Sequence, residues 1–463
     1  MAKTKLMGST YLTLRNCFIP KDGALRHCHV FVKDYRTEKI ELVSDAEYGT
    51  LPFNERTFGE YSVRCDEEDK ITVFECAGII LSPGFIDIQL NGAFGVDFSN
   101  PLISGKDVQK VAENLTAFGV THFCPTLVSS SRETYEKLIP LIGNMCRDDR
   151  SFKPTWKAAL LGMHLEGPFF DESKHGAHES EHIREKMDSK SFSNTYNKDA
   201  SCLYDGAGVS IVTLAPELPG ALDQIQALSE NNITVSLGHT NAVLKDGIDA
   251  KKRGATLLTH LFNAMRPFHH REPGLLGLLQ HCENGDDEEG IYYSIIADGL
   301  HSHPASVKMA YTMSKNVVLV TDAMSAMGLG DGQHSLGSKA VTVLNDMATI
   351  SGTDTLAGSV ASMDSCVRTF KTFTGCSHYE ALQAATRNPA KVLGLANKMG
   401  SIEEGLFADF VLLDDSLNVI RTILAGSIVH SGDDECHAFK DHCKKLHLEG
   451  STIALSGKRK EIN

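Results

Sequence analysis

The sequence predicts an α/β protein, a (β/α)8 barrel of the TIM type beside a small β-sandwich domain formed by the N- and C-terminal segments. Three observations predict this fold. Eight short apolar, β-branched runs alternate with helix-like segments. Polar residues follow the ends of these runs. The two ends of the chain instead carry short strand-like pieces separated by turns.

The barrel strands are expected in eight runs: 81–90, 120–128, 158–167, 208–217, 233–240, 255–262, 292–299 and 316–324. Helical periodicity lies between them, at 106–119, 132–145 and 221–232. A doubly wound open sheet is the alternative. It usually has fewer strands and a glycine-rich phosphate loop, and no G-x-G-x-x-G follows a strand here. The pattern therefore favours the barrel.

The domain organisation follows from the same pattern. We assign residues 81–399 to the barrel and residues 1–80 plus 400–435 to one discontinuous β-domain. A charged tail follows at 436–463. The polar, weakly periodic stretch near 187–206 is predicted to be a loop insertion, and neither it nor the tail has a functional interpretation.

Composition excludes several classes of protein. A chain of 463 residues that is 42% hydrophobic can build a large barrel and a smaller module. A net charge of −14 argues against a general nucleic-acid binder, which needs a basic face. The 12 cysteines form no C-x-x-C pair, so we expect free thiols in a reducing compartment. The start is polar and no long apolar run is present, so we expect a cytoplasmic protein without a membrane span.

The polar residues at the strand ends are the strongest pointer to a site. The carboxyl ends of barrel strands meet on one face, and this face carries the chemistry of such barrels. Core packing does not explain six polar strand ends at one topological position. The residues concerned are Gln89, Asn91, Glu166, His239, His260, Asp298, His301 and Asp322.

Among these residues, Glu166, His239 and His260 form a candidate metal-ligand set. A catalytic zinc site needs about three protein ligands and an open position for water. A lone histidine more often satisfies a buried hydrogen bond, but two at strand ends beside a carboxylate favour a metal. Asp322 is the candidate general base, with a structural cap or a fourth metal ligand as alternatives.

Other polar residues are candidates for ligand contacts. His178 lies one loop beyond Glu166 and is expected to polarise a carbonyl or bind a hydroxyl. Arg271 and His301 are candidate phosphate contacts, although a surface salt bridge is the alternative for Arg271. Asn263 offers either an amide contact or a cap, and a glycine such as Gly358 lets backbone amides approach a ligand. Four other histidines are expected on the surface: His27, His29, His175 and His182.

Seven motifs, in this order, closely resemble those of the N-acetylglucosamine-6-phosphate deacetylases of the amidohydrolase superfamily: PGFIDIQLNG, HLEGPF, LGHTNA, THLFNAM, REPGL, ADGLH and VTDAM. The resemblance extends from about Ser82 to Gly400. It implies that Glu166, His239 and His260 hold the metal and that Asp322 shuttles the proton. The substrate contacts that it implies are Ala177, His178, Asn263, Ala264, Arg271, Asp298, Gly299, Leu300, His301, Leu356, Ala357 and Gly358.

The resemblance also implies a reaction and an assembly. The expected reaction is hydrolysis of N-acetyl-D-glucosamine 6-phosphate to D-glucosamine 6-phosphate and acetate, in amino-sugar catabolism. The expected assembly is a homodimer in which the neighbouring subunit adds phosphate contacts.

One departure from the wider superfamily bears on the metal. Many members carry H-x-H at the end of the first strand and bind a second metal there, whereas this chain has Gln89 and Asn91. Neutral amides are poor ligands for a catalytic transition metal. We therefore predict one divalent cation per subunit, with zinc as the first choice and cobalt, manganese or iron(II) as alternatives.

Two rival functions stay open at this point. One is a different amidohydrolase reaction, such as deacylation of a D-amino acid, opening of a cyclic amide, or action on the galactosamine analogue. The other is an inactive barrel that serves as a scaffold, although such a protein would be expected to lose its metal ligands. Activity with and without the 6-phosphate, metal analysis and acetate release separate these functions.

Overall fold

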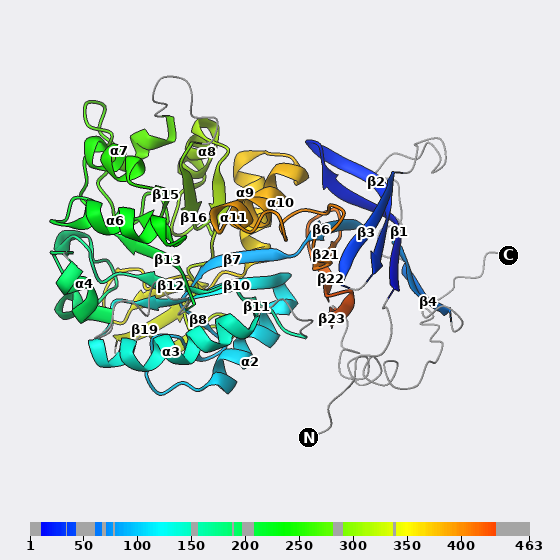
Figure 1. The fold of residues 1–463 in the computed structure, drawn as a ribbon, viewed down its shortest axis with the longest axis horizontal. Coiled ribbons are helices and arrows are strands. Elements are labelled where there is room, and N and C mark those ends of the chain that lie inside the picture. The colour runs from blue at the N-terminus through cyan, green and yellow to red at the C-terminus, as the bar shows by residue number, and fades with distance from the viewer. Residues whose placement is uncertain are drawn as a thin grey trace.

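The computed structural model describes residues 11–33, 35–42, 61–66, 71–76, 79–149, 156–187, 189–196, 208–280, 290–336 and 339–431. A barrel and a smaller sheet lie side by side, on the left and right of Figure 1. Over the described ranges, no helix is long and apolar enough to cross a membrane.

The barrel is made of parallel strands that follow one another around its wall. They are β7 (Phe85–Leu90), β10 (Val120–Val128), β12 (Met163–Glu166), β13 (Val209–Leu214), β14 (Thr234–Leu237), β15 (Ala255–Leu258), β16 (Tyr292–Ile295) and β17 (Val317–Leu319). A short strand, β11 (Ala159–Leu160), also pairs with β10. Each predicted run contains one of these eight parallel strands, and the run 158–167 also contains β11, so the predicted barrel is confirmed. The first run divides at Gly84, where a Cβ would lie 2.0 Å from Thr121 Oγ1.

Helices surround the barrel because each buries one apolar stripe against the strands. In α2, for example, the buried residues Val108, Val111, Ala112 and Leu115 recur at helical spacing. The α-helices are α2 (Gly105–Leu115), α3 (Arg132–Asp149), α4 (Ser189–Tyr196), α6 (Ala221–Glu230), α7 (Leu244–Lys252), α8 (Pro304–Met313), α9 (Met363–Thr374), α10 (His378–Ala385) and α11 (Arg387–Val392). The 3-10 turns are η2 (Thr116–Phe118), η3 (Glu172–Lys174), η4 (Ser180–His182) and η5 (Gly274–Gln280).

The loop predicted near 187–206 is wrong for part of its length, because α4 forms there. Phe192 and Tyr196 lie one helical turn apart, and both are buried. Phe192 stacks on Phe169 at 5.8 Å between ring centroids, and the Tyr196 hydroxyl donates a 2.6 Å hydrogen bond to the Gly167 carbonyl. Two aromatic anchors in a polar segment therefore hold this helix beside the end of β12.

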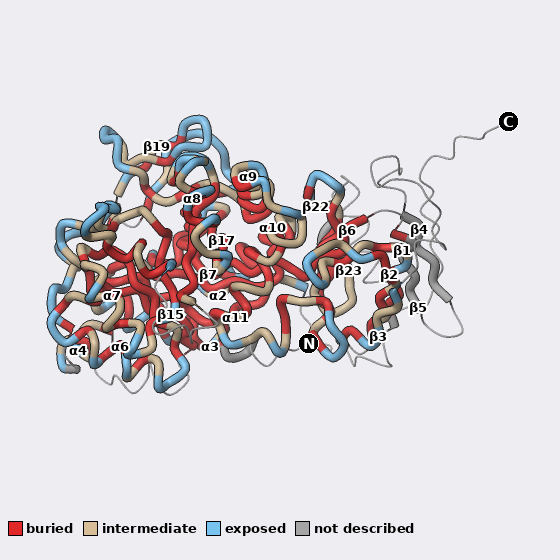
Figure 2. The backbone as a smooth tube through the Cα atoms, turned by 90° about the horizontal axis from the view of Figure 1, so that it is seen from above, coloured by how far each residue is buried: buried red, intermediate tan, exposed pale blue. Residues whose placement is uncertain are grey.

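Contacts between the first and last strands close the barrel. The Asp322 amide donates to the Gln89 carbonyl at 2.9 Å. Earlier on the same two strands, the Thr321 hydroxyl donates a hydrogen bond to Asp87 Oδ2 at 2.6 Å. Burial raises the pKa of Asp87 to about 7, and the hydrogen bonds from Thr321 and Gln89 oppose that rise. Figure 2 shows that most of the backbone in the middle of the barrel belongs to buried residues.

Both ends of the chain contribute to the smaller sheet, as predicted. Strand β6 (Ile80–Pro83) pairs with β21, so the N-terminal and C-terminal strands share one nine-stranded sheet. Its other members are β1 (Tyr11–Lys21), β2 (Ala24–Lys33), β3 (Arg36–Leu42), β4 (Tyr61–Asp66), β5 (Ile71–Cys76), β21 (Phe410–Leu413), β22 (Val419–Leu424) and β23 (Ser427–Ser431). The proposed domain limits at 80/81 and 399/400 stay predictions, and the limit at 435/436 lies outside the described residues.

The core of this sheet explains two features of its sequence. Cys17 and Cys28 are buried free thiols with their Sγ atoms 3.9 Å apart, so they act as small core residues. His27 was expected on the surface and is instead buried, with its ring 5.1 Å from that of Phe18. Two residues further along the same strand, His29 accepts a hydrogen bond from the Asn16 amide at its Nδ1.

Two small sheets complete the described structure. Strands β8 (Gly92–Ala93) and β9 (Val96–Asp97) form a short hairpin after β7. Strands β18 (Gly332–Leu336), β19 (Lys339–Leu344) and β20 (Met347–Ile350) form a three-stranded sheet after β17. This second sheet packs against the loop that carries Ala177, and it therefore bears on the site described next.

Candidate metal centre and active site

Three of the predicted site residues lie just beyond strand ends in an unusual backbone conformation. His239 follows β14 with φ of 51°, His260 follows β15 with φ of 27°, and Asp322 follows β17 with φ of 49°. This left-handed region is costly for residues other than glycine, about 1–3 kcal/mol each. Strain repeated at three converging strand ends points to a functional site.

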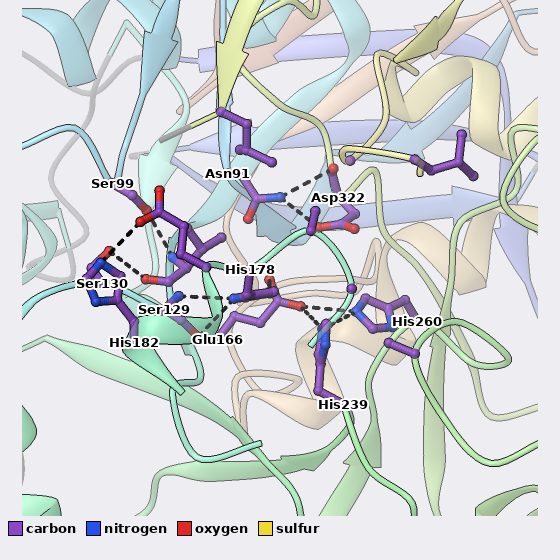
Figure 3. A pocket seen from close by; sticks show the side chains of 18 of the residues that line it. Asn91, Ser99, Ser129, Ser130, Glu166, His178, His182, His239, His260 and Asp322 are labelled. Carbon is purple, nitrogen blue, oxygen red and sulfur yellow. Dashed lines mark hydrogen bonds and ion pairs between the residues drawn. The ribbon is translucent and has the colours of Figure 1, made fainter. Parts of the chain in front are cut away.

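The side chains of Glu166, His239 and His260 converge on one point at the barrel mouth (Figure 3). Glu166 Oε1 lies 3.3 Å from His239 Nε2 and 3.1 Å from His260 Nε2, and the two nitrogens are 3.1 Å apart. All three residues are at most 4% exposed. The structure thus brings together the three predicted metal ligands.

The chemistry of these atoms fits a divalent cation. The Lys174 carbonyl can only accept, so the His239 Nδ1–H donates to it at 2.9 Å and leaves a lone pair on Nε2. Tetrahedral ligands about 2.0–2.1 Å from one zinc ion would be about 3.3 Å apart, close to the observed separations. Burial raises the pKa of Glu166, but its contacts with the His239 and His260 rings outweigh burial and hold that pKa well below its usual range. The carboxylate is therefore available as an anionic ligand.

Asp322 lies beside this centre and is held by two amide side chains. Asn91 Nδ2 donates to Asp322 Oδ1 at 2.8 Å, and Gln89 Nε2 donates to the same oxygen at 3.2 Å. Burial, followed by repulsion from the Glu166 carboxylate, raises the pKa of Asp322 to about 6. A carboxyl group with a pKa near neutrality is suited to accept and return a proton.

His178 presents a proton donor to the same centre. The Ser129 amide donates to His178 Nδ1 at 3.2 Å, so Nε2 carries the proton of the neutral ring. This Nε2 lies 4.0 Å from Glu166 Oε2. Burial, with the charge of His239 next in importance, lowers the pKa of His178 well below its usual range. The ring therefore faces the cavity as a neutral N–H donor.

A cavity of about 500 Å³ opens onto these residues, a size suited to a small organic ligand. The predicted contacts that line it are Ala177, His178, Asn263, Ala264, His301, Leu356 and Gly358.

The other predicted contacts lie outside the cavity wall. Arg271 is exposed in a surface loop, and Ala357 is buried in an apolar cluster. Asp298 instead supports His301, accepting a 2.6 Å hydrogen bond from its Nδ1, and Gly299 and Leu300 lie in the same turn. The roles of these residues as substrate contacts stay predictions.

Part of the cavity wall was missed from sequence. Its members are Ser99, Asn100, Pro101, Val128, Ser129, Ser130, Ser131, Thr134, Gly176, Glu179, His182, Ile296 and Leu336. Ser129, Ser130 and Ser131 follow the end of β10, so the strand-end rule would have found these three.

Lys339 was missed as well, although it supports the same site. Its ammonium group donates to the carbonyls of Ala177 and His178 at 2.7 and 3.1 Å. No sequence signal predicts this contact, because strand β19 is far from that loop along the chain.

The fold and the site together define a (β/α)8 barrel with a buried Glu/His/His group able to hold a metal ion, and known hydrolases share this fold. The model of the Amidohydrolase family matches residues 80–429. The N-acetylglucosamine-6-phosphate deacetylase of Bos taurus is 44% identical over 417 residues, covering 89% of this chain and 94% of that protein.

Two solved structures agree with this relationship. The N-acetylglucosamine-6-phosphate deacetylase of Pasteurella multocida is 28% identical, with a TM-score of 0.75, over 91% of this chain and all of that one. A variant of the Mycobacterium smegmatis enzyme in complex with N-acetyl-D-glucosamine-6-phosphate is 27% identical, with a TM-score of 0.72, over 92% and 100%. The chain belongs to the amidohydrolase family and, within it, to the family of the N-acetylglucosamine-6-phosphate deacetylases.

Proposed function

We propose that this chain hydrolyses N-acetyl-D-glucosamine 6-phosphate to D-glucosamine 6-phosphate and acetate. The convergence of Glu166, His239 and His260 beside Asp322 carries the proposal. The relative from Bos taurus bears the name of this enzyme, and the Mycobacterium smegmatis structure holds this sugar phosphate. The cavity of about 500 Å³ has room for a ligand of that size.

Each side chain has a defined task in the proposed reaction. A divalent cation held by Glu166, His239 and His260 would polarise the acetamido carbonyl and lower the pKa of a bound water. The His178 Nε2–H donates to the carbonyl oxygen, on which negative charge develops. Asp322 accepts the proton of the attacking water and returns it to the nitrogen as the C–N bond breaks.

The finer assignments form part of the same proposal. Zinc is the first choice for the metal, because one carboxylate and two imidazoles suit it. His301 lines the cavity and is the candidate phosphate contact within this chain. Arg271 is exposed outside the cavity, so its predicted phosphate contact fits a homodimer in which the phosphate lies between subunits.

The test is acetate release by the purified protein after chelation and after restoration of Zn²⁺. We expect acetate from N-acetylglucosamine 6-phosphate only when metal is restored, and much slower release from N-acetylglucosamine without the phosphate. Absence of acetate with zinc, cobalt, manganese and iron(II) would refute the proposal. Equal rates for the two sugars would point to another amidohydrolase substrate.

A further inference from the structure

Asn91 lies just beyond the end of β7 and is 4% exposed. Its Nδ2 donates to Asp322 Oδ1 at 2.8 Å and to the Asp322 carbonyl at 3.4 Å. Both partners are acceptors, so they fix which end of the amide carries the nitrogen. Figure 3 shows the Asn91 nitrogen turned toward Asp322 and its oxygen on the opposite side.

That oxygen is a buried acceptor in need of a donor. Asn91 Oδ1 has no hydrogen-bond partner among the described residues, and Asn91 lines the cavity beside Glu166 and Asp322. A buried polar atom left without a partner is costly, and such atoms in native proteins call for a functional explanation. Gln89 Nε2 also donates to Asp322 Oδ1, and in addition to Glu166 Oε1, but Gln89 is not part of the cavity wall. The two amides therefore share a structural role, and Asn91 has a second one.

We propose that Asn91 Oδ1 accepts the N–H of the scissile amide and so orients the reacting nitrogen. The inference rests on the proposed function, in which Asp322 must deliver a proton to that nitrogen. One side chain touches both partners, because Nδ2 holds Asp322 while Oδ1 holds the N–H. The lone pair that develops on nitrogen as the carbonyl carbon becomes tetrahedral then faces Asp322. Asn91 itself exchanges no proton and forms no bond.

The test compares an amide substrate with an ester that lacks the N–H. The pair is N-acetylglucosamine 6-phosphate and 2-O-acetylglucose 6-phosphate, measured with the zinc-loaded full chain. We expect Asn91→Ala to lower kcat/KM for the amide about tenfold more than for the ester, because only the amide loses a hydrogen bond. Asn91→Asp keeps an acceptor oxygen there, so it should retain more of the preference for the amide.

Gln89→Ala is the matched control for the shared structural role. This substitution removes hydrogen bonds to Asp322 and Glu166, and it should lower kcat/KM for both substrates by similar factors. Thermal melting and metal content show whether each variant is folded and loaded. If the wild type hydrolyses the ester too slowly to measure, the ester is instead tested as an inhibitor of amide hydrolysis. The inhibition constant of the ester should then be the same for Asn91→Ala as for the wild type.

An equal loss for amide and ester in Asn91→Ala would overturn the inference while leaving the proposed function intact. Failure of the wild-type protein to release acetate from the amide would instead remove the proposed function, and the inference with it.

Discussion

Two groups of acids and histidines lie near the barrel mouth. Both are compact, but they differ in burial and in the elements that supply their residues. The buried centre is Glu166, His239 and His260, and the rim cluster is Glu179, Glu181 and His182; each has its ligand atoms within 4.8 Å. The centre is at most 4% exposed, whereas the Glu181 side chain is 76% exposed. Closeness alone therefore does not distinguish a metal site from a solvated cluster.

The two groups also differ in how they are assembled. The rim cluster comes from a single turn at η4, with His182 Nε2 at 3.4 Å from Glu179 and 3.8 Å from Glu181. The centre takes one residue from each of three strand ends, and two of its residues have left-handed backbone. Solvent screens charges at the rim, while buried charges must satisfy one another or a cation. The difference teaches that burial and strain mark the functional group.

The largest expected effect is on the buried centre. Glu166→Gln removes its anionic ligand and should abolish bound zinc while lowering kcat by at least about 1,000-fold. Metal content by mass spectrometry and acetate release measure both. Glu181→Gln, in the exposed rim cluster, should change each by less than about twofold. Loss of zinc in Glu181→Gln with zinc retained in Glu166→Gln would reverse the comparison.

Substitution of Asp322, with the three candidate metal ligands unchanged, should separate the effect on proton transfer from the effect on metal binding. Asp322→Asn preserves shape but cannot accept a proton, so kcat should fall by about 100- to 10,000-fold. Zinc content should stay near that of the wild type. Turnover close to wild type would show that another group carries the proton, and loss of zinc would make Asp322 a ligand.

The pH dependence of kcat/KM should follow the raised pKa of the Asp322 carboxyl group. The reaction requires the Asp322 carboxylate, and burial raises its pKa to about 6. Below its pKa the group is protonated and inactive as a base, so activity should fall about tenfold per pH unit. A bound cation favours the charged form, so the metal-loaded enzyme should show this limb at or below about pH 6. A limb above pH 7 would contradict the assignment.

We expect the smallest effect on kcat from substitution of Lys339, which supports the loop between the buried centre and the rim cluster. Lys339→Met removes the ammonium that binds the carbonyls of Ala177 and His178, so the His178 N–H should lose alignment. We expect kcat to fall about three- to tenfold with KM changed less. Lys339→Arg keeps donors and charge and should recover part of the loss. Equal defects in both variants would argue against a hydrogen-bonding role.

The sequence predicted the architecture well because it depends on local signals. Alternating strand and helix patterns predicted the barrel, and the strand-end rule selected Glu166, His239, His260 and Asp322 before any contact was known. The structure brings these four side chains together. The same rule, applied to the end of β10, would also have found Ser129, which orients His178.

Other features depended on contacts that no local pattern carries. Helix α4 packs through Phe192 and Tyr196. Its other residues are mostly polar, so the sequence pattern does not indicate a packed helix there. Lys339 reaches the His178 loop across more than 160 residues of chain. Such contacts join separate segments of the folded chain, so periodicity gives no sign of them.

The sequence by itself determined which residues end the strands, because side-chain alternation and strand boundaries are local properties of the chain. Only the tertiary structure decided what those residues became. It set the 3.1–3.3 Å separations at the centre and the tautomers of His178 and His239. It also left the Asn91 side-chain oxygen without a hydrogen-bond partner in the described part of the chain. Burial decided these properties, because a polar atom removed from water must find its partner within the fold or in a ligand.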